Sequence, residues 1–308
     1  MKVLITGTTG FVGKNLKSFL YQREYNITEV NRTKVIPGSF TFGEAVKGAC
    51  SAEAWVHLAA KANDIVRPKL LDEYIEANVE LTKKLFSAFI NDPIADTFIY
   101  VSTIKAAAAI ASHPLTEDDE LEVDIPYGAS KRMAEKYLLS VQLPPQKKLV
   151  ILRPTMVYGY NKSSNLYSLY KLVKNGLPYP FAAFTNSRTM LSIDNLVFVI
   201  WQIIKNKQFK PGIYNVADDE PVSTNQLIDL MGTAIGKKPV KWNIPVWLVR
   251  SIASIGDVAR LPINTKKINK LTESYIVSNT KLKQELKEPL PWSAKESLLN
   301  LFSDFNKQ

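Results

Sequence analysis

Short apolar runs alternate with amphipathic stretches through the first half of the chain. The apolar runs predict β-strands at Lys2–Thr6, Ile27–Asn31, Ala54–Leu58, Thr97–Val101 and Leu149–Arg153. The stretches between them repeat apolar positions at helical spacing and predict helices at Val12–Tyr21, Tyr74–Ile90 and Tyr127–Val141. Because strands that alternate with helices assemble into a parallel sheet covered on both faces, the pattern predicts a doubly wound α/β fold.

The pattern changes from about Met156 onward. Gly, Pro, Tyr and Asn become frequent there, and regular alternation is lost until Ser192–Asn206. We expect residues 1–155 to form one domain, with return segments near 192–217, and residues 156–191 and 218–308 to form a smaller, discontinuous C-terminal domain. Since open α/β sheets bind ligands at the carboxyl ends of their strands, the second domain is expected to cap that edge.

The composition is that of an ordinary globular protein. Of the 308 residues, 46% are hydrophobic, which is enough for a substantial core. The single cysteine, Cys50, excludes an intramolecular disulfide, and two histidines are too few for a zinc site, so we expect no metal. The net charge of +10 arises from scattered lysines, which favours a solvated basic surface, with a mild attraction for an anionic ligand as the alternative. No focused basic stripe or known module predicts nucleic-acid binding.

Two apolar segments bear on the location of the protein. The N-terminus lacks the pattern of a signal peptide, and the longest strongly apolar run, Leu196–Ile204, is about half the length of a membrane-spanning helix. We therefore expect a cytoplasmic protein. The segment Trp242–Leu261 is apolar with Arg250 and Arg260 interspersed. It predicts an amphipathic helix that packs on its own domain or on a partner subunit, with contact to the inner membrane surface as the alternative.

The first predicted strand leads into a glycine-rich turn, Thr6–Gly13, that opens the first helix. Gly7 suits a tight turn, Gly10 lets the backbone approach a pyrophosphate, and Gly13 lets the helix pack closely on the strand. Amides at the start of the helix then face the phosphates. This context predicts a dinucleotide site whose contacts include Gly7, Thr9, Gly10, Phe11 and Val12.

The end of the second strand indicates which dinucleotide is bound. An acidic residue usually stands there and holds the adenosine ribose, but this chain has Asn31 followed by Arg32. The missing carboxylate removes a reason to exclude a 2′-phosphate, and an arginine can pair with one. The sequence therefore favours NADP(H) over NAD(H), with Arg32 as a solvent-exposed loop residue as the alternative.

A tyrosine and a lysine four residues apart supply candidate proton chemistry. Tyr127 and Lys131 fall on one face of the helix that follows Pro126. A free tyrosine has a pKa of roughly 10, and a nearby ammonium, an oxidised nicotinamide and the helix N-terminus all favour its phenolate form. Upstream, strand alternation favours Thr103 over Ser102 as the hydroxyl that binds the same substrate oxygen, and a cap on the next turn is the alternative.

Together these residues resemble the extended short-chain dehydrogenase/reductase family of NAD-dependent epimerases and dehydratases, which includes UDP-glucose 4-epimerase and nucleotide-sugar reductases. The resemblance covers nearly the whole chain and lies in TGTTGFVG at Thr6–Gly13, VHLAA at Val56–Ala60, VST ending at Thr103, YGASK at Tyr127–Lys131, LRPTMVYG at Leu152–Gly159 and RTMLSIDNL at Arg188–Leu196. It implies a Rossmann domain that binds the dinucleotide and a second domain that binds a nucleotide-linked sugar.

The resemblance also implies roles for residues that the pattern alone does not single out. Leu58, Ala59, Ala60, Lys131 and Pro154 are expected at the cofactor, and Ser102, Thr155, Asn165, Leu166 and Arg188 at the substrate. An arginine suits a nucleotide diphosphate because its fork can bind two phosphate oxygens, and a surface ion pair is the alternative for Arg188. Asn78 lies on a helix that supports the site, and no catalytic role is expected for His57.

The sequence departs from the family pattern in ways that narrow the activity. Ile104 and Lys105 stand where 4,6-dehydratases have an Asp-Glu pair, so elimination of water would lack its acid and base. The third-strand region, Ser39–Phe42, is short and lacks the Asp that meets the adenine in relatives.

The residues are compatible with three functions. We expect oxidation or reduction at C4 of a nucleotide-linked sugar, with UDP as the expected nucleotide, and Arg32 and the VSTIKA stretch favour a 4-keto-sugar reductase. A UDP-glucose or UDP-N-acetylglucosamine 4-epimerase with retained NAD is the alternative. A non-catalytic NADP(H)-sensing module is the second alternative, although such relatives generally lose the Tyr/Lys pair. We also expect a homodimer.

Overall fold

The computed structural model describes residues 1–62, 71–108, 113–123, 125–258 and 265–307. They divide into two compact units, each described by itself. Unit 1 comprises 1–155, 193–217 and 277–291, and unit 2 comprises 156–192, 218–276 and 292–308. Each unit is therefore built from three separate stretches of chain.

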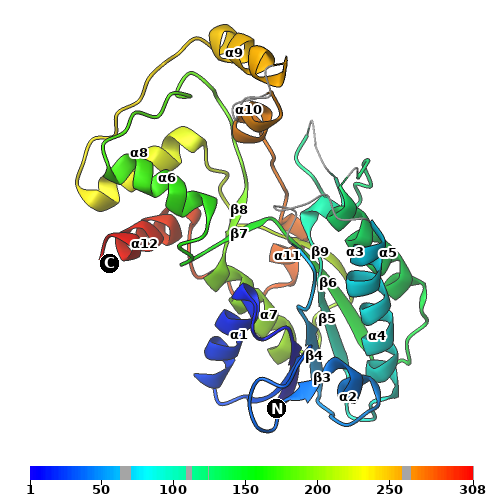
Figure 1. Ribbon diagram of the computed structural model, residues 1–308. Helices are drawn as coiled ribbons and strands as arrows, with labels where there is room; N and C mark the ends of the chain where they lie inside the picture. Colours follow the sequence, from blue (N-terminus) through cyan, green and yellow to red (C-terminus); the bar gives the residue numbers. More distant parts are fainter. Residues whose placement is uncertain (63–70, 109–112, 124, 259–264, 308) are drawn as a thin grey trace. The chain divides into compact units, whose positions relative to one another are not determined.

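A parallel sheet forms the centre of unit 1 (Figure 1). Its strands are β1 (Lys2–Thr6), β2 (Asn26–Asn31), β3 (Phe40–Thr41), β4 (Ala54–His57), β5 (Thr97–Val101), β6 (Lys148–Pro154) and β9 (Gly212–Val216), in the order β3-β2-β1-β4-β5-β6-β9. The strand order reverses direction between β1 and β4, the position at which doubly wound sheets bind nucleotides. The predicted fold class is thereby confirmed.

Helices cover both faces of this sheet. On one face lie α1 (Phe11–Tyr21) and α7 (Ile193–Lys205); on the other lie α3 (Leu71–Tyr74), the π-helix η1 (Ile75–Glu80), α4 (Leu81–Asn91) and α5 (Pro126–Ser140). Shorter elements are α2 (Phe42–Val46) and the 3₁₀ helix η2 (Ile104–Ala106). Because both faces are covered, β4 and β5 are buried throughout, which explains why they are continuously apolar in sequence.

The helix predicted over Tyr74–Ile90 differs in detail. It is divided into α3, η1 and α4, with a π-helical turn between two α-helical segments. The side chain of Asn78, in η1, bonds both backbone groups of Lys61: its Oδ1 accepts from Lys61 N at 2.8 Å and its Nδ2 donates to Lys61 O at 3.1 Å. Isolated π-helical turns are often found at functional sites.

Residues 277–291, which the sequence assigned to the second domain, belong to unit 1. A parallel bridge joins Val277 to Leu115, and Asn279 Nδ2 donates to the carbonyl of Ala217 at 2.9 Å. The helix α11 (Thr280–Glu285) then packs beside β9. These contacts join segments far apart in sequence, so no local sequence pattern predicts them.

Unit 2 packs three helices around a small parallel pair of strands. These are α6 (Asn165–Lys174), α8 (Thr224–Ile235) and α12 (Ala294–Asn306), with β7 (Met156–Tyr158) paired to β8 (Met190–Ser192). Tyr170, Ile228, Leu298 and Phe302 are buried at the centre of this cluster. Ser223 and Ser293 begin α8 and α12 with reciprocal capping boxes, which define where both helices start.

The predicted amphipathic segment of unit 2 forms α9 (Val246–Val258), followed by α10 (Thr265–Thr272); Arg260 and Leu261 lie outside the described residues. One face of α9 packs Val249 and Ala253 against Ile268. The opposite face leaves Trp247 69% exposed. Among the described residues, no helix combines the length and the apolar composition that crossing a membrane would require.

Candidate active site

The glycine loop has the backbone geometry of a phosphate cradle. Gly7 has φ +75°, a left-handed conformation, and a Cβ there would lie 3.0 Å from the backbone of Ala59. A Cβ on Gly13 would lie under 3.0 Å from the carbonyl oxygen of Gly7, closer than real Cβ atoms approach. Both positions therefore require glycine, and the loop can turn tightly while α1 packs against it.

A cavity of about 670 Å³ opens beside this loop in unit 1. Its wall contains eight residues predicted at the cofactor, namely Gly7, Thr9, Gly10, Asn31, Arg32, Leu58, Ala59 and Ala60, together with Phe42, Lys61, Glu73, Glu76, Ala77, Glu80, Leu81 and Lys84. Phe11 and Val12 begin α1 and Pro154 ends β6, outside this wall. The volume lies in the range of small-molecule and cofactor pockets.

At the end of β2, Asn31 is buried and Arg32 is exposed, and both line the cavity. Asn31 Nδ2 donates to Thr8 Oγ1 at 2.8 Å, and Thr8 Oγ1 donates to Glu29 Oε2 at 2.6 Å. The Oδ1 atom of Asn31 is buried and has no hydrogen-bond partner among the described residues. Thr8 and Glu29 were not predicted at the site, because their side chains meet Asn31 only after β1 and β2 pair.

Lys131 is held in a buried position under the carboxyl end of β5. Only 1% of the residue is exposed, and its Nζ donates to the carbonyl oxygen of Val101 at 2.8 Å. The ammonium also lies 4.3 Å from the centroid of the Tyr100 ring. Burial lowers the pKa of Lys131 to about 7, and the carboxylate of Glu135 opposes this shift.

Tyr127 occupies the first turn of α5, one helical turn before Lys131. It is half-buried, and its ring centroid lies 6.5 Å from that of Tyr74. Its backbone carbonyl accepts from Ser130 Oγ at 2.8 Å, and Ser130 Oγ accepts from Asn78 Nδ2 at 3.0 Å. Asn78 thus ties the helix that carries Tyr127 to the cavity wall at Lys61, the supporting position that the family resemblance implies.

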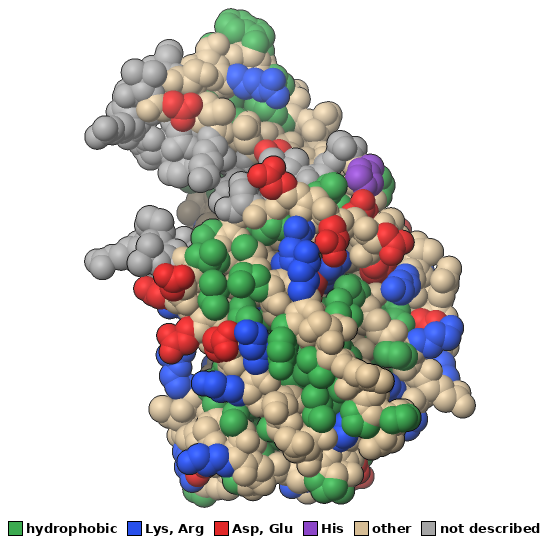
Figure 2. Space-filling model, turned by 90° about the vertical axis from the view of Figure 1, so that its right-hand side faces the viewer, with side chains coloured by type: hydrophobic (Ala, Val, Ile, Leu, Met, Phe, Trp, Pro, Cys, Tyr) green, Lys and Arg blue, Asp and Glu red, His purple; other side chains and the backbone are tan. Residues whose placement is uncertain are grey.

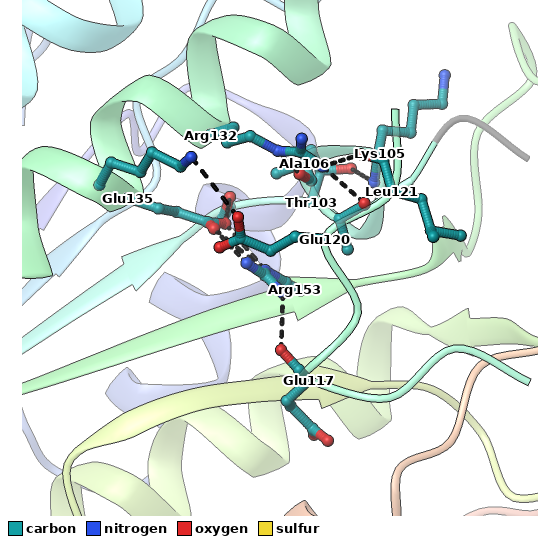
Figure 3. Close-up of polar contacts among 12 residues, drawn as sticks. Thr103, Lys105, Ala106, Glu117, Glu120, Leu121, Arg132, Glu135 and Arg153 are labelled. Atoms are coloured by element: carbon teal, nitrogen blue, oxygen red, sulfur yellow. Dashed lines mark hydrogen bonds and ion pairs between the residues drawn. The ribbon is translucent and has the colours of Figure 1, made fainter. Parts of the chain in front are cut away.

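A buried ion pair lies one turn further along α5 (Figure 3). Glu135 Oε2 accepts from Arg153 Nη2 at 2.7 Å, and Arg153, on β6, also donates to the Glu117 carbonyl at 3.3 Å. The hydroxyl of Ser102 donates to Glu135 Oε1. Ser102, which we expected at the substrate, is therefore bonded to the α5 carboxylate. Glu135 was not identified from the sequence, because its partner on β6 has no sequence marker.

Thr103 follows β5 and caps the next turn. Its Oγ1 accepts from the amide of Lys105 at 3.3 Å, the capping role weighed as the alternative, and its hydroxyl proton is left to donate. The turn packs closely on α5, because a Cβ on Gly128 would come within 2.5 Å of the Lys105 carbonyl. Arg132 holds the same turn by donating to the carbonyl of Ala106, and it also donates to the carbonyl of Leu121 (Figure 3).

His57 is a buried residue of β4 with two hydroxyl partners. Thr82 donates its proton to the Asn78 carbonyl, so the hydroxyl of Thr82 accepts from His57 Nε2 at 2.9 Å. Thr6 Oγ1 lies 2.7 Å from Nδ1 and donates to it. Burial lowers the pKa of His57 to about 3, so the ring is neutral and its bonds are structural.

The remaining predicted substrate residues lie mostly in unit 2. Asn165 is exposed at the start of α6, whereas Leu166 packs into the core of the unit. Arg188 is half-buried, and its Nε donates to the Glu273 carbonyl at 2.8 Å. Thr155, in unit 1, is buried with a side-chain oxygen that has no partner among the described residues.

Comparison with known proteins finds matches along most of the chain. The model of the NAD dependent epimerase/dehydratase family matches residues 3–217. A UDP-glucose 4-epimerase of Vibrio cholerae is 32% identical over 80% of this chain and 79% of its own. An Escherichia coli O157:H7 4-epimerase of N-acetylglucosaminyl-diphospho-undecaprenol is 27% identical over 79% and 75%. A Pseudomonas aeruginosa UDP-2-acetamido-2,6-β-L-arabino-hexul-4-ose reductase is 26% identical over 74% and 56%.

Solved structures share the fold at lower identity. The human epimerase family protein SDR39U1, determined with NADPH, superposes with a TM-score of 0.77 at 18–19% identity, as does the Bordetella bronchiseptica enzyme WbmG, determined with NAD. The alignments cover 99% of this chain and 99% of SDR39U1, and 100% of this chain and 94% of WbmG.

Proposed function

The chain belongs to the NAD dependent epimerase/dehydratase family, and from that membership we propose that it moves hydride to or from C4 of a nucleotide-linked sugar. The observation that carries the proposal is α5, whose Tyr127 and Lys131 lie one turn apart while Lys131 is bonded to the end of β5. Relatives named as UDP-glucose 4-epimerase and as nucleotide-sugar 4-reductases support this substrate class. The exact sugar and the direction of the reaction are the finer parts of the proposal.

A nicotinamide dinucleotide fits the residues that line the cavity. Gly7 and Gly13 let the loop close tightly against the chain after β4 and against α1, because a Cβ at either position would collide with backbone, and Gly10 between them is the position at which the backbone can approach a pyrophosphate. The buried Oδ1 of Asn31 has no donor within the described part of the chain, and a ribose hydroxyl could supply one. We propose that the predicted cofactor residues Gly7, Thr9, Gly10, Phe11, Val12, Asn31, Arg32, Leu58, Ala59, Ala60, Lys131 and Pro154 surround the dinucleotide.

We assign the proton to Tyr127. When bound, the dinucleotide supplies the hydride acceptor or donor. Tyr127 takes the proton of the C4 hydroxyl at its phenolic oxygen during oxidation and returns it during reduction. Because the pKa of Lys131 is lowered to about 7, the lysine is partly protonated near neutral pH, and its ammonium form favours the phenolate. The bond to the Val101 carbonyl holds its Nζ in place. Thr103 donates its remaining proton to the same sugar oxygen.

The nucleotide end of the substrate is assigned to unit 2. We propose that Asn165, Leu166 and Arg188 meet the nucleotide diphosphate and that Ser102 and Thr155 lie near the sugar. Arg188 is a half-buried cation of this unit, and the fork of a guanidinium can bind two phosphate oxygens, which supports a phosphate contact. Leu166 can contribute only backbone or a minor apolar contact, because its side chain packs in the core.

Reductase and epimerase differ in whether the cofactor leaves. We propose a 4-keto-sugar reductase using NADP(H), since Arg32 lines the cavity with an exposed side chain and the Pseudomonas relative is named as such a reductase. The second candidate is a 4-epimerase with retained NAD, which the Vibrio and Escherichia relatives favour by their names and identities.

Turnover assays separate these candidates. Purified protein is tested with UDP-glucose, UDP-N-acetylglucosamine and their 4-keto forms, with and without added NADH or NADPH, after mass spectrometry of the dinucleotide that co-purifies. The reductase predicts consumption of added NADPH only with 4-keto sugars. Interconversion of 4-epimers without added cofactor would establish the epimerase instead, and tight dinucleotide binding without any turnover would favour a sensing module.

We also propose that α9 contacts a membrane surface. Trp247, Arg250 and Ile252 of α9 are exposed, as is Trp242 shortly before the helix, and the Escherichia relative acts by name on a polyprenol-linked sugar. Co-sedimentation with anionic liposomes tests this: wild-type protein should pellet, and Trp247→Glu should stay in solution. Wild-type protein that stays in solution would refute the contact.

A homodimer is the last finer proposal. Figure 2 shows a group of hydrophobic side chains on the face that α4 and α5 cover in unit 1, and Met133 and Leu139 of α5 are exposed. Light scattering during size-exclusion chromatography should give twice the chain mass of 34.6 kDa. Met133→Lys should convert the protein to the monomer if α5 forms the interface.

A further inference from the structure

Three buried polar side chains behind the glycine loop form a chain of hydrogen bonds, the Glu29–Thr8–Asn31 relay. Thr8 Oγ1 lies 2.6 Å from Glu29 Oε2, and Asn31 Nδ2 lies 2.8 Å from Thr8 Oγ1. Lys17 pairs with Glu29 at 3.2 Å from the partly exposed side. Relative exposures of 3% for Glu29, 2% for Thr8 and 4% for Asn31 exclude solvent as a general partner.

Chemistry fixes the direction of these bonds. A carboxylate paired with a lysine can only accept hydrogen bonds, so the hydroxyl of Thr8 must donate its single proton to Glu29. Thr8 can then only accept from Asn31, which turns the amide nitrogen of Asn31 toward Thr8 and leaves Oδ1 as its second polar group. That oxygen is buried without a partner among the described residues, and Asn31 lines the cavity.

We propose that Glu29 and Thr8 are positioning residues that hold Asn31 as a neutral hydrogen-bond acceptor for the adenosine ribose. The inference rests on the proposed dinucleotide function. An acceptor without charge takes a ribose hydroxyl and does not repel a 2′-phosphate, so the site admits both dinucleotides. Discrimination in favour of the 2′-phosphate then depends on Arg32, the exposed cation on the same cavity wall.

The relay also explains why the usual acid is missing at the end of β2. A carboxylate at position 31 would face Thr8, whose only proton is already given to Glu29. Two acceptors would then compete for one proton in a buried site, and one would lose its hydrogen bond. Glu29 and Asn31 therefore depend on each other, and changing Glu29 to glutamine should permit an acid at 31 by reversing the relay.

Thermal unfolding without added dinucleotide tests this dependence apart from any activity. Asn31→Asp should lower the unfolding temperature. The double variant Glu29→Gln/Asn31→Asp should recover most of that loss, since the glutamine amide donates to Thr8 and Thr8 donates to Asp at 31. Thr28→Val, which alters a buried threonine on the same strand outside the relay, is the matched control for the effect of substitution in β2.

Equilibrium titration with NADH and NADPH, followed by nicotinamide fluorescence, tests the role in binding. Thr8→Val should lower the affinity for both dinucleotides by a similar factor, roughly 3- to 10-fold. Without the Thr8 hydroxyl the amide of Asn31 is no longer held in place, and both dinucleotides use that amide oxygen as acceptor. Arg32→Gln should weaken NADPH alone. The double variant Glu29→Gln/Asn31→Asp should lower the affinity for NADPH relative to NADH by roughly tenfold or more, because a carboxylate now faces the 2′-phosphate.

Distinct results overturn the inference and the function on which it rests. If Thr8→Val bound both dinucleotides as tightly as wild type, or if Asn31→Asp were as stable as wild type, the relay would be refuted. The proposed dinucleotide function would be unaffected by either result. Wild-type protein that binds neither dinucleotide would remove the proposed function and the ribose contact with it. The rescue of stability by Glu29→Gln would still decide whether the relay has the stated direction.

Discussion

The buried pair of Glu135 and Arg153 permits a quantitative prediction. The guanidinium makes contacts of 2.7, 3.1 and 3.3 Å with the two carboxylate oxygens, and neither residue is more than 2% exposed. Glu135→Met leaves a buried cation whose other contact in the described chain is the Glu117 carbonyl, and it removes the acceptor of Ser102. Breaking a buried pair in this way costs about 3–5 kcal/mol of unfolding free energy.

Arg153→Met should cost a similar amount, because it leaves the carboxylate with the Ser102 hydroxyl as its main partner. Apolar replacement of both partners removes the uncompensated charge, so the double variant should be at least as stable as either single variant. Urea unfolding followed by far-ultraviolet circular dichroism measures all three against wild type.

A surface pair is the control. Lys136 and Glu120 are exposed and lie 3.6 Å apart, so replacing either should change stability by less than about 1 kcal/mol. If the losses from Glu135→Met and Arg153→Met simply added in the double variant, the reasoning that charge burial dominates would be refuted.

Three further predictions concern packing and protonation. Gly13→Ala should destabilise the protein by roughly 1–3 kcal/mol, because the added Cβ would collide with the Gly7 carbonyl. Gly10→Ala should leave stability unchanged, because its Cβ would lie 3.4 Å from the same carbonyl oxygen. Equal urea midpoints for the two variants would contradict this. Gly128→Ala should likewise lower stability and slow turnover by displacing the turn after Thr103, and unchanged kcat would count against it. Because burial lowers the pKa of His57 to about 3, the unfolded chain gains its proton first, so stability falls from about pH 6.5 downward. At pH 5 the free energy of unfolding is lower by about 2 kcal/mol for this reason. His57→Gln should abolish this contribution to the fall of the unfolding free energy between pH 7 and pH 5.

Structural features that depend only on residues close together in the chain could be predicted from the sequence. The glycine loop, the strands of the first half and the spacing of Tyr127 and Lys131 each depend on neighbours within one or two turns of chain. Local sterics and side-chain periodicity determine such features, so the pattern was sufficient for them.

Features that depend on distant partners could not be predicted. Glu135 looks like a solvent-facing helix residue until β6 brings Arg153 beside it, and charged residues are seldom buried without such a partner. Thr8 and Asn31 are 23 residues apart and meet only in the paired sheet. The same reason applies to residues 277–291, which join unit 1 through contacts with Leu115 and Ala217.

The central claim is that the phenol of Tyr127 carries the proton while hydride moves at C4. The direct measurement is the rate of that transfer in wild type and in Tyr127→Phe, followed at the nicotinamide absorbance with the substrate identified by the turnover assays. We predict that the variant binds NADH and NADPH as wild type does and loses roughly 100- to 10,000-fold in rate. A variant that transfers hydride at the wild-type rate would contradict the assignment.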